Sequence, residues 1–263
     1  MKTITLLNEK GGVGKTTLST HIAAGLAIKG YRTLLLDSDP QGNASSALGL
    51  NKEPAFYDLT VRNALWKDVL KIVHPDVYST PELEAKGQLL AITSNNESRN
   101  VANSMKSRAT IRRRLQELKD AVDFVIIDTS PTPSLLNESI LLATDYVLIP
   151  TDCEAFSALE GVPDSVEHAQ VAQDAVREVG INASQLLGII PNKYRSRTAG
   201  HNEVLKLLRE QFGDYVWPPM SQFIAYSDVQ LFQQFLFGIA PNSKATKQMW
   251  KVVERIEKVA ING

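Results

Sequence analysis

The sequence predicts an α/β fold, a doubly wound and mostly parallel β-sheet with helices on both faces. Three observations predict it. Short apolar runs alternate with stretches of helical periodicity along the chain. A glycine-rich loop joins the first apolar run to the first helical stretch. The 263 residues, 43% of them hydrophobic, suffice for one large core. We therefore expect a single domain over residues 1–263, with a C-terminal helix at about 243–260 packed on it.

The first elements are expected to be a strand, a loop, a helix and a second strand. Residues 3–7, TITLL, form an apolar run typical of a buried strand. Residues 18–27 carry apolar side chains at helical spacing, and Gly30 ends that helix. Residues 32–39, RTLLLDSD, form a second apolar run that ends in acids. A βαβ unit of this kind implies parallel strands joined by a right-handed crossover.

The alternation resumes after a less regular stretch at residues 40–105, which contains Gly, Pro, Ser and Asn and short helical pieces such as residues 60–71. Further strands are expected at residues 123–128, 145–151 and 186–192, and further helices at 107–122, 157–179, 201–213 and 244–260. In open parallel sheets, ligands bind at the carboxyl ends of the strands. The functional residues are therefore expected just after the apolar runs.

Composition excludes several classes of protein. The net charge of -1 argues against a chain that binds nucleic acid with its whole surface, so any DNA contact needs a local basic patch. The single cysteine, Cys153, allows no internal disulfide and no cysteine-ligated cluster, and we expect a buried, reduced thiol. No apolar run approaches the roughly 20 residues needed to cross a bilayer. We expect a soluble, cytoplasmic protein.

The glycine-rich loop has the sequence NEKGGVGKTT at residues 8–17. It departs from the standard phosphate-loop pattern at Glu9, where that pattern has glycine, but Gly14, Lys15 and Thr16 agree with it. Glycine amides and the N-terminus of the following helix can cradle phosphate oxygens. We expect Lys15 to reach the β- and γ-phosphates of a nucleotide and the Thr16 hydroxyl to bind Mg²⁺.

Acidic residues follow two of the apolar runs. Asp37 and Asp39 end the second expected strand. Asp128 follows four apolar residues, a Walker B pattern, and is expected to hold Mg²⁺ directly or through a water. The alternative for each acid is that it caps the turn after its strand.

These segments resemble a known family. KGGVGKTT is similar to the deviant Walker A motif of the ParA/MinD family of P-loop ATPases. LLLDSDPQGNASSALGL, at residues 34–50, and the segment at residues 125–162 resemble its ParA/Soj branch. The resemblance is dense up to about residue 165 and thinner after it. It implies a P-loop NTPase fold, with ATP and Mg²⁺ as cofactors and ATP hydrolysis to ADP and phosphate.

The resemblance also implies roles for single residues. Lys10 would reach across an ATP-sandwich dimer to the phosphates bound by the partner, and Asp39 would position or activate the attacking water. Asp37 would support the Mg²⁺ shell or the loop, and Glu154 matches a position near the dimer interface or the nucleotide. The implied catalytic residues are Lys10, Lys15 and Asp39, and the implied metal site is Thr16, Asp39 and Asp128. The implied nucleotide-binding residues are Lys10, Gly11, Gly12, Val13, Gly14, Lys15, Thr16, Thr17 and, around the adenine, Asn192 and Pro219.

The family binds nonspecific DNA through basic residues that contact phosphates. The segment NKYRSRT supplies Lys193, Arg195 and Arg197, of which Arg197 matches the family best. An arginine that many relatives carry further on is absent, and Lys244 and Lys247 are the substitutes we consider. The basic run Arg112–Arg114 is expected on a solvated helix face rather than at DNA.

The resulting hypothesis is a partitioning ATPase whose ATP-dependent homodimer binds DNA at the nucleoid. A ParB-like or adaptor protein would stimulate its slow hydrolysis, and a plasmid or chromosome would be segregated. One alternative keeps the same switch but positions a protein cargo. A second is a MinD-like ATPase with a C-terminal membrane helix, which Glu254 and Glu257 argue against because they interleave with its lysines. A third is a regulator that binds nucleotide without turnover.

Overall fold

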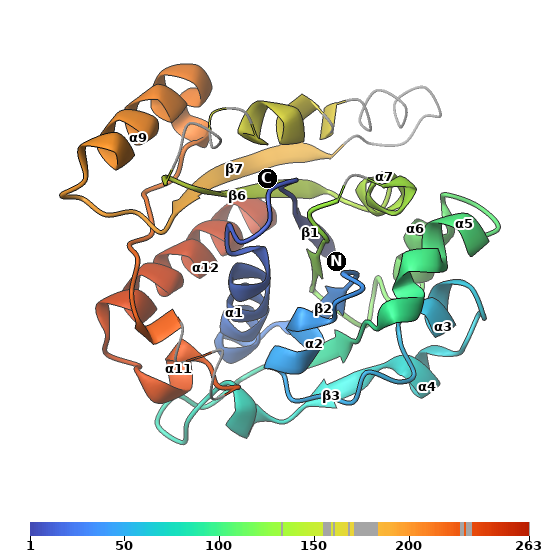
Figure 1. Ribbon diagram of the computed structural model, residues 1–263. Helices are drawn as coiled ribbons and strands as arrows, with labels where there is room; N and C mark the ends of the chain where they lie inside the picture. Colours follow the sequence, from blue (N-terminus) through green and yellow to red (C-terminus); the bar gives the residue numbers. More distant parts are fainter. Residues whose placement is uncertain are drawn as a thin grey trace.

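The computed structural model describes residues 1–132, 134–154, 159, 161–167, 169–170, 184–226, 229 and 233–262. In this part of the chain the strands form one sheet in the order β3-β4-β2-β5-β1-β6-β7 (Figure 1). All neighbours pair in parallel except β3, which is antiparallel to β4. The strands are β1 (Lys2–Leu6), β2 (Arg32–Asp37), β3 (Lys71–Val73), β4 (Gln88–Ile92), β5 (Phe124–Asp128), β6 (Tyr146–Asp152) and β7 (Gln185–Asn192).

Helices cover both faces of this sheet because its central strands are apolar on both sides. On β5, Ile126 packs toward one face, while Val125 and Ile127 pack toward the other. The first face is covered by α1 (Lys15–Lys29), α2 (Asn43–Ala47), α11 (Leu236–Ile239) and α12 (Lys244–Asn262). The second is covered by α3 (Phe56–Thr60), α4 (Trp66–Val69), α5 (Val101–Ser104), α6 (Thr110–Gln116) and α7 (Leu135–Leu141). The predicted fold class is confirmed.

A third apolar cluster joins α9 (Ala199–Phe212) to β6 and β7. Cys153 belongs to this cluster and is buried, and burial raises the pKa of its thiol to about 12. Three 3₁₀ helices complete the described elements, namely η1 (Pro75–Val77), η2 (Asn96–Asn100) and η3 (Gly213–Tyr215).

The structure differs from the sequence-based expectation mainly in residues 40–105. This stretch contains two strands, β3 and β4, and within residues 60–71 only Thr60, the last residue of α3, and Trp66–Val69 are helical. Asn63 interrupts the expected helix because its backbone takes a left-handed conformation with φ of 57°. The helix expected at 107–122 covers only Thr110–Gln116. Of the helix expected at 157–179, residues 159, 161–167 and 169–170 are helical, and residues 157–158, 160, 168 and 171–179 lie outside the described residues.

The C-terminal helix α12 packs along α1 (Figure 1). Its apolar side, which includes Met249, Val253 and Ile256, is buried. Gly25 of α1 permits this close approach, since a Cβ atom there would lie 2.6 Å from a methyl carbon of Val253. Glu257 adds an ion pair to Lys29 at 2.6 Å. In the described part of the chain no helix is both long and apolar enough to span a bilayer.

Candidate active site

A cavity of about 1280 Å³ opens at the carboxyl edge of the sheet. It brings together residues from segments far apart in the sequence, because the ends of the parallel strands meet at this edge. Its lining includes Gly11, Gly12, Gly14, Lys15, Thr16, Thr17, Asp39, Thr129, Asn192 and Lys193. Two segments that the sequence did not indicate also line it, namely Ser98–Arg99 after β4 and Met220–Phe223 before α11.

The glycine loop connects β1 to α1 in a conformation that requires glycine at two positions. Gly12 and Gly14 have φ of 77° and 96°, in the left-handed region. Asn192, the last residue of β7, donates its side-chain amide to the carbonyl of Val13 at 3.0 Å. A Cβ atom on Gly14 would lie 2.3 Å from that amide nitrogen. Asn192 therefore supports the loop backbone. Pro219 is half-buried, and its neighbour Met220 lines the cavity.

Lys15 is the first residue of α1 and its side chain bends back over the loop. Its ammonium donates to the carbonyls of Asn8 at 2.7 Å and Lys10 at 2.9 Å. The residue is only 6% exposed. Burial lowers the pKa of Lys15, while the charges of Asp128 and Asp39 act in the opposite direction. A buried cation thus lies beside the N-terminus of a helix, an arrangement that attracts a phosphate.

Thr16, the second residue of α1, contacts Asp128 at the end of β5. The Thr16 hydroxyl donates to Oδ2 of Asp128 at 2.8 Å. The other carboxylate oxygen, Oδ1, is buried and has no hydrogen-bond partner among the described residues. Burial, followed by the charge of Asp37, raises the pKa of Asp128. A buried carboxylate in this position is stabilised by a cation, because the charged form otherwise lacks compensation.

The chemistry of these donors fits Mg²⁺. The side chains at this point offer carboxylate and hydroxyl oxygens, which are the ligand atoms that Mg²⁺ prefers. Within the described residues, no group of three or more His, Cys, Asp or Glu side chains could hold a metal alone. In nucleotide sites, Mg²⁺ is generally held by one or two carboxylates together with phosphate oxygens and water.

Asp37 and Asp39 occupy different environments. Asp37 ends β2 beside Asp128 on β5, and its Oδ2 accepts hydrogen bonds from the backbone and hydroxyl of Ser45 at 2.8 and 2.6 Å. Burial raises the pKa of Asp37, and the bonds from Ser45 counteract this shift. Asp39 lies two residues further and lines the cavity, and it accepts a bond from the backbone of Gln41 at 2.9 Å.

The first lysine of the loop, Lys10, forms an ion pair with Asp152 at 3.0 Å. Its backbone amide donates to the side chain of Asn8 at 2.7 Å, and Asn8 in turn donates to the carbonyl of Pro150 at 2.8 Å. Lys10 therefore lies at the end of β6, at the margin of the loop. The sequence did not indicate Asp152 as its partner, since the two residues are 142 positions apart.

The basic residues proposed for DNA lie on two connected segments. Arg197, Lys244 and Lys247 are exposed. The segment at residues 220–222 joins their elements, because the backbone of Tyr194 bonds with those of Met220 and Gln222, and the amide of Ser221 donates to Gln248 of α12. Lys193 lines the cavity.

Two arginines are held in ways that the sequence did not indicate. Arg195 faces Glu154 at 3.6 Å and contacts Gln222. Arg114 is not on the solvated face expected for residues 112–114. Its side chain is 12% exposed, donates to the carbonyl of Ala64 at 2.6 Å and lies over the ring of Trp66.

Comparisons with known proteins find similar sequences over most of the chain. A family model described as an AAA domain matches residues 1–180. The chromosome-partitioning ATPase Soj of Treponema pallidum is 35% identical over 220 residues, which cover 82% of this chain and 81% of the relative. The Thermus thermophilus Soj is 32% identical over 258 residues, which cover 97% of this chain and 95% of the relative.

The fold matches solved structures as well. A cobyrinic acid a,c-diamide synthase from Mycobacterium smegmatis, solved with bound ADP and magnesium, superposes with a TM-score of 0.76 at 23% identity. The match covers 98% of this chain and 94% of that one. At this level of identity the likeness concerns the fold.

Proposed function

The chain belongs to the ParA/Soj family of partitioning ATPases, and we propose that it is itself an ATP-dependent partitioning ATPase. The observation that carries this proposal is the pairing of Thr16 with Asp128 beside the glycine loop, where one carboxylate oxygen is buried without a partner. Thr16 and Asp128 would hold a divalent cation there, and this cation would supply positive charge next to the phosphates.

Different residues of the chain carry out different parts of ATP hydrolysis. The loop amides and Lys15 bind and neutralise the β- and γ-phosphates, and Thr16 and Asp128 would hold Mg²⁺. When bound, Mg²⁺ supplies charge stabilisation on the phosphates. Asp39 orients the attacking water from the cavity wall, with Asp37 as a supporting carboxylate behind it. Most catalysis in phosphoryl transfer comes from such positioning and charge stabilisation.

Lys10 is proposed to link hydrolysis to assembly. In the ATP-bound homodimer it leaves Asp152 and contacts the phosphates held by the partner, so that ATP joins the two chains. Two triphosphates buried face to face need more positive charge than each loop supplies alone, which supports a lysine donated across the interface. Its position at the margin of the loop, with one third of the side chain exposed, supports this role.

The homodimer is proposed to bind nonspecific DNA through Arg197, Lys244 and Lys247, with Lys193 and Arg195 nearby, and thereby to associate with the nucleoid. A ParB-like or adaptor protein would stimulate hydrolysis and release the DNA, which would move a plasmid or chromosome. The linkage of the two basic segments through residues 220–222 supports one continuous surface. The names of the Soj relatives support partitioning as the task.

Sedimentation velocity with Mg²⁺ and ATP, ADP or no nucleotide tests the assembly step, with phosphate release measured on the same samples. We expect the wild type to form a dimer with ATP only and to release phosphate slowly. Lys15→Ala should neither dimerise nor release phosphate. A chain that releases no phosphate and stays monomeric with ATP would contradict the proposal.

A further inference from the structure

Asp37 is a buried carboxylate that the proposed chemistry uses only indirectly, yet the fold surrounds it with donors. It is 1% exposed. Its Oδ2 accepts two hydrogen bonds from Ser45, and its Oδ1 accepts one from the amide of Asp39 at 3.2 Å. Donors aimed at both oxygens favour the charged carboxylate and fix its orientation. Two of these three bonds come from one residue, Ser45.

The direction of the Ser45 hydroxyl is determined by its other neighbour. The backbone amide of Ser94 donates to the Ser45 hydroxyl oxygen at 2.9 Å, so the hydroxyl proton is directed to Asp37. The Ser94 hydroxyl donates in turn to that of Ser98 at 2.8 Å. All four side chains are buried. A continuous row of hydrogen bonds therefore connects the end of β2, through α2 and the end of β4, with η2.

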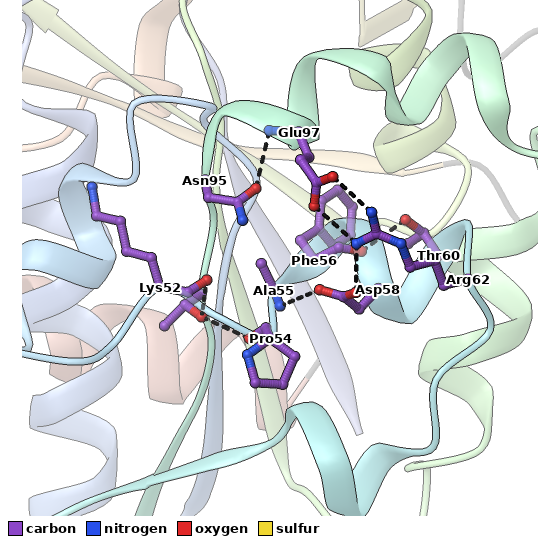
Figure 2. Close-up of polar contacts among 10 residues, drawn as sticks. Lys52, Pro54, Ala55, Phe56, Asp58, Thr60, Arg62, Asn95 and Glu97 are labelled. Carbon is purple, nitrogen blue, oxygen red and sulfur yellow. Dashed lines mark hydrogen bonds and ion pairs between the residues drawn. The ribbon is translucent and has the colours of Figure 1, made fainter.

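The far end of this row is anchored on the protein surface. Figure 2 shows the guanidinium of Arg62 between the carboxylates of Asp58 and Glu97, at 2.7 Å from each. In the same view, the side chain of Asn95 accepts from the amide of Glu97, at 3.0 Å. These contacts hold η2 against the turn after α3. The turn that carries Ser94 and Ser98 is thus fixed from both sides.

We propose that Ser45 is a positioning residue of the cation site, which holds the Asp37 carboxylate beside Asp128 and thereby strengthens Mg²⁺ binding. This inference rests on the proposed function, because it assumes that Thr16 and Asp128 hold the cation. Asp37 and Asp128 are paired residues on adjacent strands. A second carboxylate on the neighbouring strand would attract the cation whether or not it contacts it. The residues that orient such groups affect metal affinity strongly.

The test measures the affinity of the ADP complex for Mg²⁺ by titration calorimetry, together with ADP affinity in EDTA. We expect Ser45→Ala to weaken Mg²⁺ binding about 10-fold, the scale found when groups that orient metal ligands are removed. ADP affinity in EDTA should stay as in the wild type, because the loop is untouched. If Ser45→Ala destabilises the fold, Ser45→Cys is the second variant to measure. It fills the same space with a weak donor and should also weaken Mg²⁺ binding.

The matched control is Ser165→Ala. Ser165 is also buried, but its hydroxyl donates to the carbonyl of Gly161 within the helical segment at residues 161–167, and it does not line the cavity. We expect its Mg²⁺ affinity to equal that of the wild type. An equal loss in both variants would show a general effect of removing a buried hydroxyl and would overturn the proposal.

A double-mutant cycle separates positioning from packing. In an Asp37→Asn background, which keeps the shape but loses the charge, Ser45→Ala should have little further effect on Mg²⁺ affinity. A full additional loss there, or unchanged Mg²⁺ affinity in Ser45→Ala alone, would overturn the role of Ser45 and leave the ATPase proposal intact. If the ADP complex of the wild type does not bind Mg²⁺, both the role of Ser45 and the ATPase proposal are overturned.

Discussion

The nucleotide cavity and the basic surface next to it use charged residues in opposite ways. Lys15 lines the cavity, and Asp37 and Asp128 lie next to each other at the ends of β2 and β5. All three are at most 6% exposed, and each makes short hydrogen bonds. On the basic surface, Arg197 and Lys247 are exposed, and the Arg195 pair with Glu154 spans 3.6 Å. The free energy of a buried charge depends on each of its partners. An exposed charge acts mainly through its contribution to the total charge of its surface. Single substitutions should therefore have large effects in the cavity and small, graded effects on the surface.

The largest effect is expected for Lys15→Ala. It removes the cation that faces the phosphates, and hydrogen bonds to charged groups contribute about 1.5–3 kcal/mol each. ATP affinity should fall by about 100-fold. Calorimetric titration with ATP and Mg²⁺ measures it, with thermal melting to verify the fold. ATP binding within a few-fold of the wild type would contradict the contrast between buried and exposed charges, since a buried charge would then be dispensable.

Asp39→Ala should separate catalysis from binding within the same cavity. The carboxylate lines the wall but is not part of the loop that holds the phosphates. We expect ATP binding and the ATP-dependent dimer to persist while turnover falls at least ~100-fold, the contribution typical of a positioned acid or base. Phosphate release and sedimentation on one preparation measure both. Turnover at the wild-type rate would remove Asp39 from the mechanism.

A pH-dependent loss of stability is expected from His21, which lines the cavity from α1. Its Nδ1 bonds the carbonyl of Thr17 at 2.8 Å and its Nε2 accepts from the amide of Leu236 at 3.2 Å, so the ring is held neutral. Burial lowers the pKa of His21 from 6.5 to about 4. The unfolded chain takes up the proton first, so stability is lost as the pH falls from 6.5 toward 4, by about 3 kcal/mol in total.

Urea unfolding between pH 7 and 4 measures this loss. His21→Gln should lower the dependence on pH relative to the wild type, because the variant has no proton to take up. His74→Gln, a change at a side chain that is 75% exposed, should leave the dependence as it is. Identical pH profiles for wild type and His21→Gln would show that burial of this ring has no energetic consequence.

The smallest effects belong to the basic surface. Arg197→Ala and Lys247→Ala should each weaken DNA binding only a few-fold and reduce the slope of log affinity against log salt by about 1. Fluorescence anisotropy with a DNA duplex across a salt series measures this. Lys67→Ala, which removes an exposed lysine of α4, is the matched control. If it changes the slope as much as the other two, the DNA contact lies elsewhere.

The same contrast explains what could be predicted from the sequence. Strands β1, β2, β5, β6 and β7 carry apolar runs because they are buried, and the glycine loop has a pattern that its conformation requires. Strand β3 has only three residues and lies at the edge of the sheet, and β4 follows an irregular stretch. Neither strand was predicted, because the surrounding Gly, Pro, Ser and Asn indicated irregular structure.

Partnerships between side chains could not be predicted. Nothing local marks Asp152 as the partner of Lys10 or chooses Ser45 over Ser46 as the donor to Asp37, because the tertiary fold decides both. Arg114 looked exposed in a basic run, yet the ring of Trp66 and the carbonyl of Ala64 bury it. Residue type predicted the chemistry of the site, and only the packed structure revealed how its members are held.

We propose that bound ATP switches on DNA binding through Lys10. The most direct measurement is binding to a nonspecific DNA duplex at one moderate salt concentration, with ATP, ADP or no nucleotide, for the wild type and Lys10→Ala. We predict that DNA binds only the wild type and only with ATP. If ATP drives dimer formation but DNA never binds, or if Lys10→Ala binds DNA as well as the wild type, the claim is contradicted, and the former result favours a protein cargo.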